Sequence, residues 1–119
     1  MKLSNNKEVG VFGENLACEY LIKNGYKILE RNKRFSRFCE IDIIAQIKNT
    51  LVFVEVKTRK TNNFGTPLEA ITKTKYKHLI QGVLQYLSET KSKLNYRIDA
   101  IGITIEPKQE IQHLQNISI

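Results

Sequence analysis

The most constraining feature of this chain is an apolar segment, residues 51–58, that is interrupted by two charged residues, Glu55 and Lys57. The segment has the composition of a buried strand. Side chains alternate between the two faces of a strand, so Glu55 and Lys57 point the same way. Because a buried unpaired charge is costly, such residues are usually paired, bound to a metal or used in chemistry. The segment therefore predicts a strand with a polar site on one face.

A second carboxylate is expected beside this pair. Asp42 lies in another apolar segment, residues 40–47, and the short polar stretch 48–50 has the character of a hairpin loop. Antiparallel pairing about that loop places Asp42 near Val56. Two acids on neighbouring strands, followed by x-Lys, are the ligand set of a magnesium-dependent phosphodiester nuclease. A structural salt bridge between Lys57 and either acid is an equally good interpretation of the strand pattern alone.

The nuclease interpretation assigns a role to each of these groups. Mg²⁺ takes oxygen ligands and keeps several waters, so we expect Asp42, Glu55 and the Val56 carbonyl to bind it. Lys57 would orient the attacking water or neutralise charge in the transition state. Glu14, at the edge of the apolar stripe of a predicted helix, would complete the shell directly or through water.

Charge indicates a polyanionic partner. The chain has 19 Lys and Arg against 12 Asp and Glu, a formal net charge of +7, which favours nucleic acid first and an anionic membrane surface second. Each basic residue alone is more simply a solvated surface group, but several cluster in sequence around the predicted site. We expect phosphate contacts from Arg31, Arg34, Arg37, Arg59, Lys73 and Lys75.

Other features narrow the class of protein. No apolar stretch approaches the roughly 20 residues of a spanning helix, and the first residues lack the apolar core of a secretory signal. Cys18 and Cys39 have no CxxC spacing, which argues against a zinc site or a disulfide framework. We therefore expect no membrane association and a cytoplasmic location.

The order of elements predicts one α/β domain spanning residues 1–119, a sandwich with a mixed central sheet flanked by helices. Three further assignments concern single residues. Glu40 should sit at the exposed start of its strand, Asp99 should pair with Arg97 or a helix lysine, and His78 and His113 should be structural or surface residues. The expected elements, in the order α-β-β-β-α-β-β, are a helix at 7–24, strands at 26–31, 40–47 and 51–58, a helix at 67–89, and strands at 96–105 and 110–117.

Several strings resemble one family when taken together. The chain resembles the bacterial YraN-like family of small endonuclease-related proteins over nearly its whole length. The matching strings are Gly13-Glu14-Asn15-Leu16-Ala17, Arg31-Asn32, Glu40-Ile41-Asp42-Ile43-Ile44-Ala45, residues 51–59, Phe64-Gly65-Thr66-Pro67-Leu68-Glu69-Ala70-Ile71-Thr72 with Lys75, and Arg97-Ile98-Asp99. One departure is Cys39, which stands where the family usually has Gly before Glu-Ile-Asp.

The resemblance implies the restriction-endonuclease-like PD-(D/E)xK fold, close to archaeal-type Holliday junction resolvases. It implies Glu14, Asp42, Glu55 and Lys57 as the active-site set, with Mg²⁺ or Mn²⁺. We therefore expect a metal-dependent DNA endonuclease acting on branched or damaged DNA, with RNA as a further substrate class left open. The sequence leaves the oligomeric state open; related resolvases dimerise, and a homodimer would suit cleavage of two strands. The alternative is a nucleic-acid-binding or adaptor domain of the same fold that does not cleave.

Overall fold

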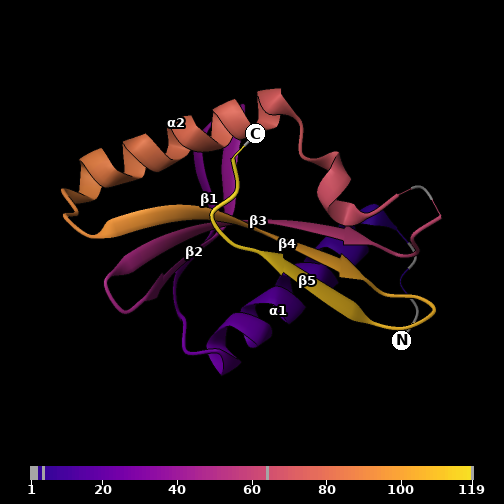
Figure 1. The fold of residues 1–119 in the computed structure, drawn as a ribbon. Coiled ribbons are helices and arrows are strands. Elements are labelled where there is room, and N and C mark those ends of the chain that lie inside the picture. The colour runs from indigo at the N-terminus through magenta and orange to yellow at the C-terminus, as the bar shows by residue number, and fades with distance from the viewer. Residues whose placement is uncertain (1–2, 4, 64, 119) are drawn as a thin grey trace.

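A computed structural model describes residues 3, 5–63 and 65–118 of the chain. Two α-helices and five strands follow one another in the predicted order α-β-β-β-α-β-β (Figure 1). The elements are α1 (Asn6–Lys23), β1 (Lys27–Ser36), β2 (Cys39–Ile47), β3 (Thr50–Arg59), a 3₁₀ helix η1 (Pro67–Ala70), α2 (Lys73–Thr90), β4 (Asn95–Thr104) and β5 (Glu110–Leu114).

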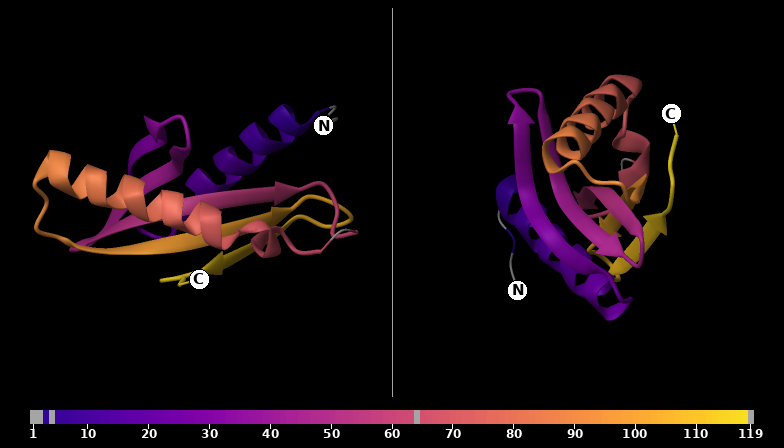
Figure 2. Two further views of the ribbon diagram at one scale, coloured as in Figure 1. Left: turned by 90° about the horizontal axis from the view of Figure 1, so that it is seen from above. Right: turned by 90° about the vertical axis from the view of Figure 1, so that its left-hand side faces the viewer.

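The five strands form one mixed sheet in the order β1-β2-β3-β4-β5. Only β3 and β4 run parallel, and α2 makes the crossover between them, whereas the other neighbours are antiparallel. The helix α2 covers one face of the sheet and α1 the other, and the β1–β2 hairpin projects beyond the sheet beside α2 (Figures 1 and 2). The predicted α/β class with a mixed sheet is therefore confirmed. Neither α1 nor α2, within the described part of the chain, is long and apolar enough to cross a membrane.

Each face of the sheet has its own apolar core. On β3, the side chains of Val52, Val54 and Val56 pack in the cluster that includes Ala17 and Leu21 of α1. The intervening β3 residues Leu51 and Phe53 pack in a second cluster with Leu79 and Val83 of α2. This alternation gives β3 a continuous apolar sequence, because both of its faces are buried. It also assigns Glu55 to the α2 face, in line with Leu51 and Phe53.

Three expected elements differ from the structure by several residues. The last strand, expected at 110–117, ends at Leu114. The first strand was expected to end at residue 31 and continues to Ser36. The helix expected at 67–89 is wrong at its start, since Pro67 opens only the short η1 and Ile71 is extended. Thr72 then caps α2, its Oγ1 accepting a hydrogen bond from the Lys75 N–H at 3.1 Å. This break lets Ile71 bury its side chain while α2 begins afresh above the sheet.

A buried polar network fixes the other side of the sheet. Asp99 on β4 is completely buried and accepts hydrogen bonds from Arg97 Nε at 3.0 Å and the Asn116 N–H at 2.9 Å. His113 Nε2 lies 2.8 Å from its other oxygen, and Tyr20 of α1 contacts the second ring nitrogen of His113 at 2.9 Å. The expected pairing of Asp99 with Arg97 is confirmed, and His113 is structural. Its partnership with Asp99 was not expected.

Candidate active site

The sheet opens where β2 and β3 leave one another. Their last paired residues are Ile43 and Val54, and beyond them the Val56 N–H donates to Asp42 Oδ2 at 2.8 Å. A side-chain carboxylate thus takes the place of a backbone carbonyl. The predicted placement of Asp42 near Val56 is confirmed by this contact. The strand pairing is shifted by one residue from the expected turn, because Thr50 belongs to β3 and the turn contains only Lys48 and Asn49.

The second carboxylate, Glu55, lies beside the first. Its side chain is only 2 % exposed, and it lines the same hollow as Asp42. Burial and the neighbouring Glu55 carboxyl group together raise the pKa of Asp42 to about 9, although the Val56 N–H opposes the shift. A proton, or another cation, is therefore favoured at this pair.

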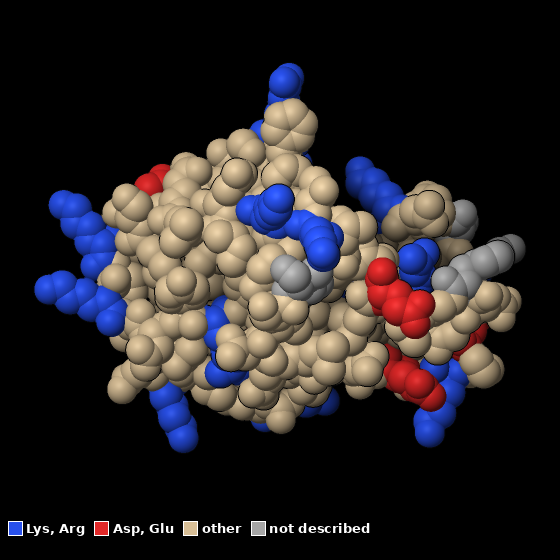
Figure 3. Space-filling model, turned by 45° about the horizontal axis from the view of Figure 1, so that its top comes forward, with Lys and Arg blue, Asp and Glu red and all other residues tan. Residues whose placement is uncertain are grey.

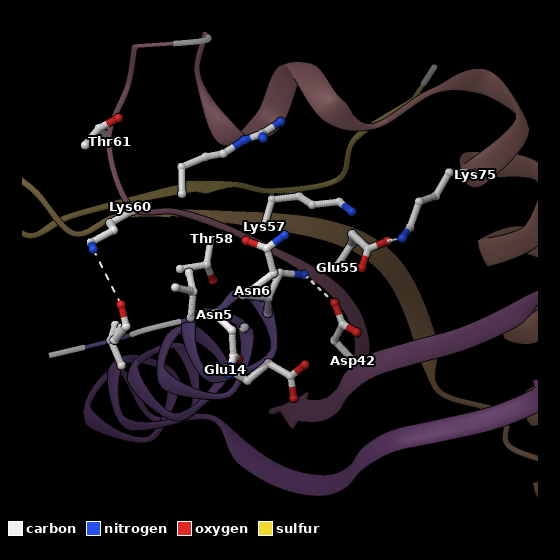
Figure 4. Close-up of a pocket in the computed structure, with 15 residues that line it drawn as sticks. Asn5, Asn6, Glu14, Asp42, Glu55, Lys57, Thr58, Lys60, Thr61 and Lys75 are labelled. Atoms are coloured by element: carbon white, nitrogen blue, oxygen red, sulfur yellow. Dashed lines mark hydrogen bonds and ion pairs between the residues drawn. The ribbon is translucent and has the colours of Figure 1, made fainter.

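The ammonium group paired with the carboxylates belongs to Lys75 and not, as expected, to Lys57. Lys75, near the start of α2, places its Nζ 3.0 Å from Glu55 Oε2 (Figure 4). That contact is an ion pair without hydrogen-bond geometry, and Oε2 has no hydrogen-bond partner within the described chain. Lys57 makes no ion pair with Asp42 or Glu55 at 4.0 Å or less within the same described residues, so the alternative of a Lys57 salt bridge is wrong.

The two lysines influence one another across the site. Burial, followed by the charge of Lys75, lowers the pKa of Lys57. For Lys75, burial alone would lower the pKa, but the Glu55 carboxylate raises it overall. Lys75 is thus held as the counter-ion of Glu55, while Lys57 is the ammonium that gives up its proton more readily.

Glu14 reaches the same hollow from α1 (Figure 4). Its neighbour Gly13 lies against Thr58 of β3 so closely that a Cβ there would come within 2.7 Å of the Thr58 Cβ. This close approach brings the Glu14 carboxylate to the sheet, where burial raises its pKa. The Arg31 guanidinium, 3.8 Å away, opposes the shift, whereas the Glu55 charge adds to it.

These groups line a hollow of about 560 Å³. A second hollow of about 370 Å³ adjoins it, and Asp42 and Lys75 line both. Besides Lys75, three of the basic residues expected to contact phosphate line one or the other of these hollows. Arg59 lines the first, and Arg34 and Arg37 line the second.

The remaining basic residues are arranged differently. Arg31 contacts Glu14 and donates to Asn15 Oδ1 at 2.8 Å, and Lys73 is exposed at the start of α2 without lining either hollow. On the face in Figure 3, Lys and Arg side chains are scattered over the edges and the middle, and most of the acidic side chains lie toward its right-hand end.

Glu40 and Cys39, which precede Asp42 in the chain, both make specific contacts. Glu40 is partly exposed at the start of β2 and binds Arg34 at 2.9 Å, as expected of a residue outside the carboxylate pair. Cys39 is buried, and it lies so close to Gly82 of α2 that a Cβ on Gly82 would come within 2.6 Å of its Sγ. The thiol thus fills space between β2 and α2 and leaves the carboxylates in place.

The arrangement can be tested against a divalent metal. Among the described residues, no three acidic, histidine or cysteine side chains converge as a metal-binding group, so Glu14 does not join the pair directly. Two carboxylates nevertheless suit Mg²⁺, which is commonly held by one or two carboxylates and keeps several waters. Glu55 Oε2 is buried and has the Lys75 ion pair but no hydrogen bond among the described residues. The Val56 carbonyl leaves β3 on the same side as its N–H, toward Asp42, so these residues fit the ion.

Sequence reasoning missed the role of Lys75 and the surroundings of His78. Lys75 was expected to contact phosphate, and no strand or helix pattern links it to Glu55 across 20 positions. His78 stacks on Phe38 of the β1–β2 turn, with ring centroids 5.8 Å apart. The only sequence signal for the contact between Phe38 and His78 was the presence of a Phe in a short polar turn.

The fold and the site define an α/β protein with a carboxylate pair and two lysines where neighbouring strands part. The chain belongs to the family described as "Uncharacterised protein family UPF0102", whose model matches residues 13–103. This confirms the YraN-like resemblance.

Curated relatives match nearly end to end. A UPF0102 protein of Caldicellulosiruptor bescii is 46% identical over 116 residues, covering 95% of this chain and 96% of the relative. One from Syntrophomonas wolfei is 42% identical over 113 residues, covering 93% and 97%. One from Flavobacterium psychrophilum is 40% identical over 115 residues, covering 96% of each. The names of these relatives state no activity, so they establish family membership alone.

Proposed function

We propose that this protein is a Mg²⁺- or Mn²⁺-dependent DNA endonuclease that hydrolyses a phosphodiester bond. One observation carries the proposal. Asp42 and Glu55 come from neighbouring strands to one hollow, where Glu55 raises the pKa of Asp42, and the buried Oε2 of Glu55 has the Lys75 ion pair but no hydrogen bond among the described residues. Carboxylates kept this close without basic neutralisation of both are costly, and a divalent cation would relieve that cost.

Each residue of the candidate site would have a distinct role in the proposed reaction. Asp42, Glu55 and the Val56 carbonyl would hold the ion, which when bound polarises a phosphate oxygen and lowers the pKa of a bound water. Lys57, on the same strand face as Glu55, would orient the water or neutralise charge at the phosphate. Its lowered pKa also suits proton transfer. Glu14 would act through water, because it stands off from the carboxylate pair.

Charge supports DNA as the substrate. The net charge of +7 favours a polyanion, and Arg34, Arg37 and Arg59 line the two hollows that meet at Asp42. Phosphate contacts of this kind position a backbone without reading its sequence. We extend the proposal to branched or damaged DNA on the strength of the resemblance to junction resolvases, and that resemblance also motivates a homodimer.

The test is cleavage of linear, flapped and four-way DNA with Mg²⁺ or Mn²⁺. The isosteric variants Asp42→Asn and Glu55→Gln should each lower the cleavage rate by at least about 100-fold while DNA binding survives. Glu89→Gln is the matched control, since that carboxylate is exposed at the far end of α2. Cleavage that persists in both site variants would show that the assigned site is wrong. Salt-sensitive binding without cleavage of any substrate would instead establish the non-catalytic alternative.

A further inference from the structure

The second hollow has an aromatic wall that the proposed chemistry does not use. The β1–β2 turn consists of Arg37 and Phe38, and both residues line this hollow together with His78 of α2. Asp42 and Lys75 are shared with the candidate active site. A volume of about 370 Å³ falls within the range of small-molecule sites, about 300–1,000 Å³. The hollow is therefore large enough for one flat ring beside the carboxylates.

Phe38 is unusually placed for an aromatic residue. Its side chain is 64% exposed, although Phe is among the residue types most often buried. Two-residue hairpin turns favour Gly, Asn and Asp, so turn geometry does not account for a Phe here. The ring is nonetheless held in place, because it stacks on His78 at 5.8 Å with planes 27° apart. The Phe38 N–H also donates to Ser36 Oγ at 3.2 Å.

A cation already lies over this ring. The Arg37 guanidinium carbon is 4.9 Å from the Phe38 ring centroid, and Arg37 is itself exposed. The Phe38 ring therefore already binds one planar group, the Arg37 guanidinium. Because Arg37 is exposed, its side chain can move from the ring to solvent or to a phosphate. Arg34, on the same hollow, is held by Glu40 at 2.9 Å.

We propose that Phe38, supported by His78, stacks against an unpaired base of the DNA next to the phosphate held at the carboxylate pair. This deepens the proposed nuclease function and rests on it, because it names the substrate class as DNA with an unpaired segment. Bases inside a continuous duplex already stack on one another, so only an unpaired base offers its face to Phe38. The base takes the position of the Arg37 guanidinium, and Arg37 turns to the adjacent phosphate.

The chain contains no Trp, which allows a direct optical test. Phe38→Trp puts a single Trp at the turn and keeps an aromatic face. In buffer with EDTA, its emission should be quenched by oligothymidylate and by a flapped duplex. A fully paired hairpin with the same number of phosphates should bind with little quenching. Equal quenching by the paired hairpin, or binding of oligothymidylate without quenching, overturns the proposal.

A second measurement separates stacking from apolar bulk. By fluorescence anisotropy, Phe38→Leu should weaken binding of labelled oligothymidylate by about 5- to 150-fold. Its affinity for the paired hairpin should stay within about twofold, since phosphate contacts are retained. Tyr96→Leu is the matched control, because Tyr96 is 49% exposed on β4 at the end of the sheet away from Glu55. Urea unfolding of each variant verifies that it folds.

The results distinguish this inference from the nuclease proposal. If unpaired DNA binds through Phe38 but no DNA is cut, the stacking assignment stands and the nuclease proposal fails. If DNA is cut and Phe38→Leu binds both probes as the unmodified protein does, the stacking assignment fails and the nuclease proposal stands. An equal loss of affinity for both probes would make Phe38 a duplex wedge and overturn the assignment.

Discussion

Replacing Asp42 with Asn should make the metal-free protein more stable, even though it removes the proposed chemistry. The pKa of Asp42 is raised from its ordinary 3.8 to about 9 by burial and by Glu55. An acid whose pKa is raised by folding binds more protons in the folded state. Its stabilising contribution is complete below the unfolded pKa and is lost as pH rises toward the folded pKa. The side chain therefore destabilises the fold increasingly between about pH 4 and pH 9.

The magnitude follows from the same shift. At pH 7 the folded protein keeps a proton that the unfolded chain has released, and each pKa unit corresponds to about 1.4 kcal/mol. The interval between 3.8 and pH 7 then gives an upper limit of about 4 kcal/mol. Asn is neutral at every pH in this range. Its side-chain oxygen can still accept the Val56 N–H, and its amide places no charge beside Glu55. We expect a gain of about 1–4 kcal/mol at pH 7.

The assay is urea unfolding with EDTA, at about pH 4 and pH 7, for the unmodified protein and Asp42→Asn. The advantage of Asn should be present at pH 7 and nearly absent at pH 4. Saturating Mg²⁺ should stabilise the unmodified protein more than Asp42→Asn, because ligand binding to the folded state adds to its stability. A variant that is less stable at both pH values, or that gains equally at both, would refute the reasoning.

Three further predictions concern stability. Asp99→Asn should cost about 3–5 kcal/mol of unfolding free energy, since Asp99 is fully buried with Arg97 and His113 as partners; a loss below about 1 kcal/mol in urea unfolding would contradict this. Burial would raise the pKa of Asp99, but hydrogen bonds from its partners outweigh it and lower that pKa. The stabilisation from Asp99 is therefore present above the unfolded pKa and is lost as pH falls through the folded pKa. Acid titration followed by circular dichroism should show an unfolding transition that depends on Asp99. Gly13→Ala should destabilise by about 1–3 kcal/mol through overlap with Thr58, whereas Gly10→Ala, with open space around it, should be neutral or stabilising; equal melting temperatures for the two variants would count against the close approach of α1.

Periodicity and local turn chemistry predicted most of the fold. The alternation and apolar continuity of residues 51–58 identified β3, and the apolar stripe at 7–24 identified α1. The second helix was placed too early because Pro67 suits a helix start, but the burial of Ile71 favours an extended break and Thr72 provides a better cap. Tertiary packing decided that boundary.

The candidate site was predicted in part. The strand pattern placed Asp42 and Glu55 near each other, and a one-residue error in register did not separate them, because the Asp42 carboxylate reaches the Val56 N–H. The ion pair of Lys75 with Glu55 depends on how the α2 crossover returns over the sheet. The contact of Phe38 with His78 likewise joins distant segments. Single-sequence patterns carry no information on such pairings.

Asp42 also serves the sheet itself. Its carboxylate occupies the position of a main-chain acceptor for β3, so the proposed metal ligand and the integrity of the strand edge reside in one side chain. Loss of Glu55 would leave that edge intact, whereas an apolar residue at position 42 would leave the Val56 N–H without a hydrogen-bond acceptor. A relative without the proposed activity would thus be free to lose Glu55 first, while Asn, Ser or another hydrogen-bond acceptor persisted at position 42.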